Sequence, residues 1–340
     1  MEKNNKNNLS NIIKPFFDLS FFFLIVTIIL FGLLILTTSS IELSYKNYGE
    51  PFHYSFQQIG YLIFSVFVCS FFLFLSSENL KKNYKVFLLF FLFLLVLVVI
   101  PDIGKTVNNS TRWLSYGGLN IQPSEFFKLF YVIWLCAYLD YNKKNIHKFE
   151  IFIMPILCFF ISAILLLKQP DFGSTAVIFL MTLVMLFIAR AKIFHLMTLF
   201  FSGAIGASIL IYLSPERLSR FNLIEPCSDY LGDGYHLCWS LMAIGSGGIF
   251  GKGLGASTTK LSYLYGAHTD FIFAILAEEL GIFGVVFTII LFYLFIKKCF
   301  FVGDKALRVG LIFQGYGAGG THQEDELALF DFQRYVIQCR

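Results

Sequence analysis

The chain has 340 residues, of which 57% are hydrophobic and only 14% are charged, and its mean hydropathy is +0.71. These values exclude an ordinary soluble globular domain of this length. The net charge is +4, and the Lys and Arg residues lie between apolar runs instead of along one face, so the sequence does not support a nucleic-acid-binding protein. We therefore expect the lipid bilayer to be its main solvent.

Eight apolar windows are long enough to cross a hydrocarbon core about 30 Å thick. They cover residues 20–36, 58–75, 86–100, 123–139, 151–167, 175–189, 194–213 and 271–296. Each should be helical, because lipid offers no water to satisfy an open backbone. The predicted fold class is all-α, a polytopic transmembrane helical bundle with a large outer loop, residues 214–270, between spans seven and eight.

Basic residues predict the orientation of these spans. If the amino terminus is cytoplasmic, every inner connection contains Lys or Arg, for example Lys81, Lys82, Lys143 and Lys144, whereas the short outer connections contain few. The positive-inside rule then predicts a multi-pass inner-membrane protein with a cytoplasmic amino terminus. The first apolar run lacks an A-x-A site, so a cleavable signal peptide is not expected.

A polar constellation leads from an outer segment into the fourth span. Arg112 lies in the segment, Gln122, Ser124 and Glu125 lie at the start of the span, and Lys128 lies one turn deeper, where an ionisable residue suggests a functional site. Arg112 and Lys128 could bind a diphosphate, since Arg offers a planar fork and Lys a point charge. Alternatively, Lys128 pairs with Glu125 at i,i+3 and only fixes the helix end; the two interpretations are compatible.

A second acidic candidate lies at the entrance of the sixth span. Asp171 precedes Gly173 and Ser174, a pattern typical of a turn and helix cap. It could also form an ion pair with Lys168 that has no role in function, or contribute to a substrate site.

The outer loop contains a glycine-rich stretch, residues 245–255, which includes Lys252 and is flanked by Ser240 and Lys260. These three residues are candidate substrate ligands. These glycines allow tight turns and expose backbone N–H groups, which by themselves are a weak signal for a phosphate cradle. The Walker spacing is absent, so ATP chemistry is not supported. Cys227 and Cys238 lie in the same loop and could pair, which the sequence leaves open.

Asp270 is the most informative candidate, because it stands at the mouth of the eighth span with His268 beside it. A partly desolvated carboxylate there could serve as a general base. Asp is also a good helix N-cap, so a purely structural role is the alternative. Glu278 and Glu279 lie two turns further into the apolar helix and are costly there unless a basic group pairs with them.

At these residues the chain resembles the SEDS family, which includes FtsW, RodA and SpoVE. The matching segments follow the family's order and topology: Arg112 with Trp113, then Gln122–Lys128, Gln169–Gly173, Ser240–Gly255 and His268–Gly281. The segments around Ser240 and Gly253 are more similar to the division-type members than to the elongation-type members.

The resemblance implies a peptidoglycan glycosyltransferase that polymerises lipid II into glycan strands during septal cell-wall synthesis and cell division. Asp270 matches the family's essential outer acid, and Arg112 and Lys128 match positions implicated in function. A class B penicillin-binding transpeptidase and other division-complex membrane proteins are the implied partners. No cofactor is certain, and a divalent cation, Mg²⁺ or Mn²⁺, is an expectation without assigned ligands.

The carboxyl-terminal region departs from the family, which has ten spans. Residues 1–298 are expected to form a truncated membrane domain, and residues 299–340 a divergent polar tail without a spanning window, consistent with a truncation or frameshift. Such a chain could be inactive. Two other functions stay open: a flippase for the lipid-linked precursor, and a non-catalytic division scaffold.

Overall fold

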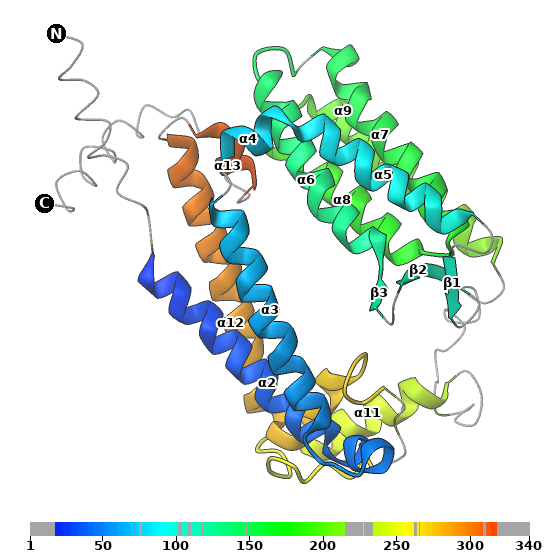
Figure 1. Cartoon of the computed structure of the whole chain (residues 1–340), viewed down its shortest axis with the longest axis vertical. Helices are drawn as coiled ribbons and strands as arrows, with labels where there is room; N and C mark the ends of the chain where they lie inside the picture. Colours follow the sequence, from blue (N-terminus) through cyan, green and yellow to red (C-terminus); the bar gives the residue numbers. More distant parts are fainter. Residues whose placement is uncertain are drawn as a thin grey trace, which may run out of the picture. The chain divides into compact units, whose positions relative to one another are not determined.

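The computed structural model of the chain describes residues 18–74, 77–100, 104–107, 110–116, 119–146, 148–214, 227, 234–261, 264, 266–308 and 311–317. Each of the eight predicted spans coincides with a helix, so the prediction of a helical bundle is confirmed (Figure 1). The chain divides into two compact units: residues 1–70 with 215–298, and residues 71–214 with 299–340.

The first unit holds α2 (Leu19–Tyr48), α3 (His53–Phe74), α11 (Tyr235–Gly247) and α12 (Ile272–Arg308) as far as residue 298. Phe31 of α2 meets Phe287 of α12 edge to face, with ring centroids 5.2 Å apart. At the start of α2, Asp18 caps the helix and its carboxylate lies 3.0 Å from the Lys298 ammonium of α12. These contacts hold α2 alongside α12 (Figure 1).

The second unit holds α4 (Ser77–Lys82), α5 (Tyr84–Val99), β1 (Gly104–Val107), β2 (Ser110–Tyr116), β3 (Leu119–Ile121), α6 (Pro123–Tyr141), α7 (Phe149–Lys168), α8 (Phe172–Ile188), α9 (Ile193–Tyr212) and α13 (Ile312–Gly317). Its core is built around α6, which contacts α4, α5, α8 and α13. Tyr131 of α6 is fully buried, and its hydroxyl lies 2.7 Å from that of Thr182 in α8. This hydrogen bond satisfies a phenol that would otherwise be costly in an apolar interior.

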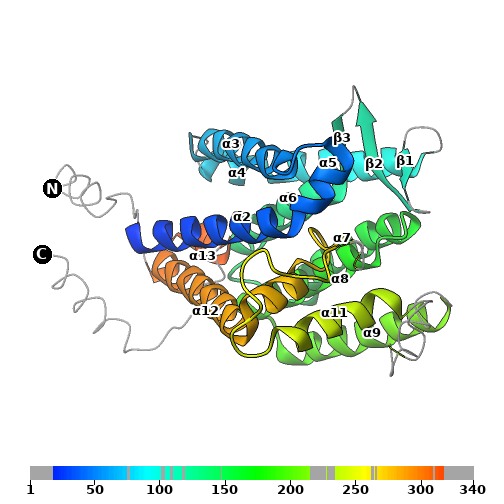
Figure 2. The same cartoon turned by 90° about the horizontal axis from the view of Figure 1, so that it is seen from below.

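A small antiparallel sheet, which the sequence analysis did not predict, stands at one end of α5 and α6 (Figure 2). Its order is β1-β2-β3, with Lys105 opposite Trp113 and Ser115 opposite Asn120. The sheet gives Arg112 a fixed position on β2, directly before α6.

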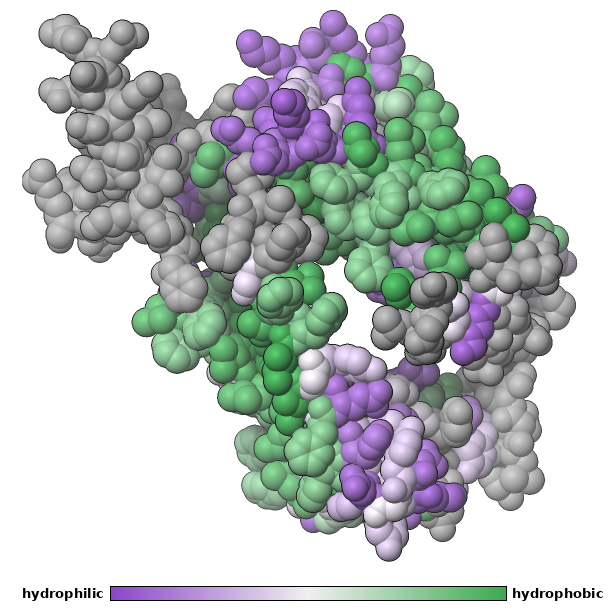
Figure 3. All heavy atoms as spheres, in the orientation of Figure 1, coloured by the Kyte–Doolittle hydropathy of each residue, from purple (hydrophilic) through white to green (hydrophobic). Residues whose placement is uncertain are grey.

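The flanks of the helices expose large apolar side chains, while hydrophilic residues gather at helix ends (Figure 3). Phe67 of α3 and Phe194 of α9 are 72% and 75% exposed. Soluble proteins rarely expose such surfaces, which are ordinary where lipid replaces water. Among the described residues, the four helices α2, α7, α9 and α12 are long and apolar enough to cross a membrane, and α5 and α8 are shorter apolar helices. The chain is a multi-pass membrane protein.

The region after residue 298 begins as a continuation of a helix. The helix α12 runs on to Arg308, and α13 follows at Ile312–Gly317, where Tyr316 is buried in the core of the second unit. The predicted division into a membrane domain and a polar tail stays a prediction, and most of that tail, residues 318–340, lies outside the described residues.

Candidate functional site

The long helix α12 is broken at Gly281, whose backbone has φ 65° and ψ −161°. The glycine-rich stretch 245–255 fills the break with its own backbone. The N–H groups of Lys252 and Gly253 donate to the carbonyls of Glu278 and Glu279, at 3.0 and 2.9 Å. The prediction of tight glycine turns is confirmed, but these two N–H groups are used inside the protein and are not free to cradle a phosphate.

Gly251 has to be glycine because the glycine-rich stretch approaches the backbone of α12 closely at this residue. Its φ is 76°, in the left-handed region, and a Cβ on it would collide with the carbonyl oxygen of Glu279. Backbone atoms cannot move aside as a side-chain tip can, so the stretch and the helix fit together only without a side chain here.

We expect Gly251→Ala to lower the midpoint of thermal unfolding in detergent and to speed amide hydrogen exchange in residues 247–253. Gly255→Ala is the matched control, because Gly255 also has a left-handed φ of 78° but has open space beside it. Both changes impose the backbone cost of about 1–3 kcal/mol, and only Gly251→Ala adds the collision. Equal losses in the two variants would contradict this account of the break.

Glu278 lies at the break with its side chain fully buried, and it is surrounded by donors. Its carboxylate accepts from the Lys252 ammonium at 2.6 Å, from the Ser257 hydroxyl at 2.5 Å, and from the backbone N–H and hydroxyl of Thr258 at 3.2 and 3.1 Å. The stretch that follows the glycines is thereby tied to the helix. A buried carboxylate is tolerated only with such compensation.

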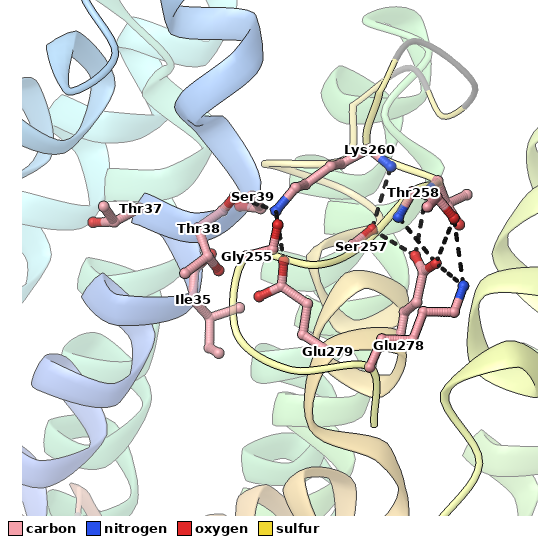
Figure 4. Close-up of polar contacts among 12 residues, drawn as sticks. Ile35, Thr37, Thr38, Ser39, Gly255, Ser257, Thr258, Lys260, Glu278 and Glu279 are labelled. Carbon is pink, nitrogen blue, oxygen red and sulfur yellow. Dashed lines mark hydrogen bonds and ion pairs between the residues drawn. The ribbon is translucent and has the colours of Figure 1, made fainter. Parts of the chain in front are cut away.

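Glu279 is equally buried and pairs with Lys260, whose ammonium lies 2.7 Å from its Oε1 atom (Figure 4). The same ammonium donates to the carbonyl oxygens of Gly255 at 2.8 Å and Thr38 of α2 at 3.0 Å. Its three acceptors match the three donors of a Lys ammonium. Lys260 therefore connects α2, the glycine-rich stretch and the first half of α12.

Lys252 and Lys260 were predicted as substrate ligands, and that role stays a prediction. The structure gives each an internal carboxylate, on Glu278 and Glu279. The sequence analysis noted that these two acids need basic partners, but it did not connect them with the two lysines.

Asp270 lies in the turn directly before α12 and is exposed. Its carboxylate makes no hydrogen bond with another of the described residues. The alternative role as a helix cap is therefore not supported by a contact among these residues. Burial lowers the pKa of the neighbouring His268 below its usual value, and the Asp270 charge opposes this by favouring the protonated ring. The two side chains therefore influence each other electrostatically. Phe271, the residue after Asp270, stacks its ring on that of His236 in α11, with centroids 5.8 Å apart.

Arg112, in the second unit, holds the turn between α7 and α8. Its Nε donates to the Gln169 carbonyl at 3.3 Å, and its Nη2 donates to the Pro170 carbonyl. Asp171 caps α8 by accepting from the Ser174 N–H at 3.1 Å, as its structural interpretation predicted. Its other oxygen, Oδ2, is buried and has no hydrogen-bond partner among the described residues.

The residues at the start of α6 form local pairs. Lys128 lies 2.8 Å from Glu125, which confirms the predicted i,i+3 ion pair. Gln122 donates from its amide to the hydroxyl of the buried Ser124 at 3.0 Å. These contacts fix the helix end, and a role of these residues in substrate binding stays a prediction.

Two further expectations concern α11. Cys227 and Cys238 form a disulfide with a Cα–Cα distance of 5.0 Å, so the pairing that the sequence left open is present. Ser240 is buried and donates its hydroxyl to the Leu237 carbonyl of its own helix.

In the part of the chain that the structure describes, no three His, Cys, Asp or Glu side chains gather where they could hold a metal ion. The expected Mg²⁺ or Mn²⁺ stays a prediction.

Known proteins share this sequence and this architecture. The sequence profile of the FtsW, RodA and SpoVE cell cycle proteins matches residues 18–317. This chain belongs to that family. A relative from Thioalkalivibrio sulfidiphilus, described as "Probable peptidoglycan glycosyltransferase FtsW", is 36% identical over 89% of this chain and 76% of its own length. A protein from Buchnera aphidicola with the same description is 38% identical over 86% of this chain and 77% of its own length.

Two solved structures share this fold. The Thermus thermophilus rod shape determining protein RodA aligns with a TM-score of 0.60 at 22% identity, covering 90% of this chain and 82% of the other. A chain from "Structural coordination of polymerization and crosslinking by a peptidoglycan synthase complex" aligns with a TM-score of 0.69 at 22% identity, covering 90% and 84%. At this level of identity these structures support the fold alone.

Proposed function

We propose that this protein is a peptidoglycan glycosyltransferase that polymerises lipid II into glycan strands during cell division. The observation that carries the proposal is Asp270, an exposed carboxylate in the turn directly before α12. The relatives described as glycosyltransferases support it, because they match most of this chain.

In the proposed reaction Asp270 acts as general base. It accepts the proton of the acceptor sugar hydroxyl, whose oxygen attacks the anomeric carbon of the donor sugar. The bond from that carbon to the diphosphate oxygen breaks, the electron pair leaves with the lipid diphosphate, and the configuration at carbon is inverted. Asp270 carries a proton at the end of the step and returns it to water.

The departing diphosphate needs positive charge. The family resemblance assigns this role to Arg112 and Lys128, and each would exchange a present acceptor, the carbonyl oxygens of Gln169 and Pro170 or the carboxylate of Glu125, for phosphate oxygens. Since the described residues offer no metal cluster, we propose that any Mg²⁺ or Mn²⁺ arrives with the diphosphate.

The cellular location of the protein and its partner are also proposed. The chain would lie in the bacterial inner membrane at the division septum, with a cytoplasmic amino terminus, as the distribution of basic residues favours. A class B penicillin-binding transpeptidase would be its partner. The similarity to a chain of a peptidoglycan synthase complex supports a partner of this kind.

Transport of the precursor is a second candidate, favoured by the broken helix α12 with its buried acids, since transporters place substrate sites at broken helices. Liposomes that contain the purified chain, its transpeptidase partner and fluorescent lipid II separate the two functions. We expect glycan polymer, resolved by gel electrophoresis, which protein-free liposomes do not make. Lipid II that crosses the bilayer without polymer would identify a transporter instead.

A further inference from the structure

Four aromatic rings meet where the turn between α2 and α3 lies beside the turn that precedes α12. Tyr48 stacks on His53, with centroids 3.8 Å apart and planes 15° apart. Tyr54 meets Tyr48 edge to face at 5.6 Å and lies 5.2 Å from His268. We call Tyr48, His53, Tyr54 and His268 the ring array. All four belong to the first unit.

The ring array is not part of a packed core. Tyr48 is 54% exposed, and the other three rings are only half-buried. Its edge is polar, because the Asn47 side-chain amide donates to the Tyr54 hydroxyl at 3.3 Å and two of the four rings are imidazoles. The array therefore offers open aromatic faces bordered by hydrogen-bonding groups.

Such a surface matches the chemistry of a sugar. A pyranose has a face of C–H groups with small positive partial charges and a rim of hydroxyls, whereas an aromatic ring has a negative face. Tyr also supplies a large contact area at a small cost in conformational entropy. The mutual ring contacts hold the four side chains in place before any ligand arrives.

The position of the array indicates which sugar it would meet. His268 lies two residues before Asp270, and the charge of Asp270 acts on its imidazole. We propose that the ring array is a sugar-binding subsite that stacks a pyranose of the glycan strand beside Asp270. The identity of that sugar as part of the growing glycan rests on the proposed function, whereas the binding of a pyranose does not.

Binding of β-1,4-linked N-acetylglucosamine tetramer to the full chain in detergent, followed by saturation-transfer NMR, tests the subsite. Tyr54→Leu and Tyr48→Leu keep apolar bulk but remove the aromatic face, and we expect each to weaken binding about tenfold. Tyr54→Phe keeps the face and should bind within about threefold of the parent. Tyr61→Leu is the matched control, since Tyr61 is a 57% exposed tyrosine two turns further along α3.

Three results would overturn the subsite: no binding by the parent chain, equal binding by the Leu variants and the parent, or an equal loss in Tyr61→Leu. The last two are what tyrosines that only anchor the protein at the membrane interface would give. A parent that binds the tetramer but makes no polymer would contradict the proposed function and support the subsite. Leu variants that make polymer and bind the tetramer as the parent does would contradict the subsite and support the proposed function.

Discussion

Replacing Asp270 by Asn is expected to abolish glycan polymerisation and to leave the fold intact. An amide cannot accept the proton of the acceptor hydroxyl, and general-base catalysis contributes roughly 10²–10⁴-fold to such reactions. The carboxylate is exposed and makes no hydrogen bond with the other described residues, so its loss breaks no contact on which the fold depends. We expect the rate of polymer formation from lipid II to fall at least about hundredfold.

A matched acid-to-amide change elsewhere separates this role of Asp270 from a general effect of losing a surface charge. Glu50→Gln is the matched control: it also converts an exposed acid to an amide in the first unit, and it should retain the parent rate. An Asn variant with more than about a tenth of the parent rate would exclude Asp270 as the base.

The helices could be predicted because lipid imposes long apolar runs, but their ends could not. The hydropathy pattern predicts a first span that ends at Leu36, whereas α2 continues to Tyr48. Its next residues are polar, yet their hydroxyls bond within the helix: Thr37 donates to the Leu33 carbonyl and Ser39 to the Leu36 carbonyl, at 2.8 and 3.0 Å. Hydroxyls satisfied in this way can be buried in a helix although a hydropathy window ends at them.

The small sheet was missed for a related reason. Its strands are three to seven residues long, and their pairing depends on contacts with α5 and α6 that no local pattern contains. β-propensity is strongly context-dependent, so a short strand carries little signal of its own.

The members of the candidate site could be predicted more reliably than its contacts. Local contacts followed from spacing, as with Lys128 beside Glu125 and Asp171 at the start of α8. The pairs of Lys252 with Glu278 and Lys260 with Glu279 span 26 and 19 residues. They depend on the break at Gly281, and nothing in the local sequence says which loop fills that break.

Breaking the pair of Lys260 and Glu279 is expected to have the largest effect on stability in the first unit. Lys260→Met leaves Glu279 as an uncompensated charge and deprives the Gly255 and Thr38 carbonyls of a donor. Removal of one partner from a buried ion pair costs about 3–5 kcal/mol. A local loss of that size should speed hydrogen exchange at the amides of Lys252 and Gly253 more than about hundredfold.

Lys252→Met is the matched control, because it makes the same substitution in the neighbouring pair. The Lys252 side chain is 33% exposed, against 6% for Lys260, so water can partly replace its ammonium at Glu278. In addition, Ser257 and Thr258 continue to donate to that carboxylate. We therefore expect the loss to be about 1–2 kcal/mol.

The double variant Lys260→Met with Glu279→Gln shows whether the two groups act as a pair. Without the charge on Glu279, the missing ammonium costs less, so the double variant should be more stable than the sum of the two single losses predicts. Additive losses, or equal losses in Lys252→Met and Lys260→Met, would mean that the pair does not hold the glycine-rich stretch against α12. Coupled losses accompanied by a reduced polymerisation rate would mean that the same pair also positions the turn that bears Asp270.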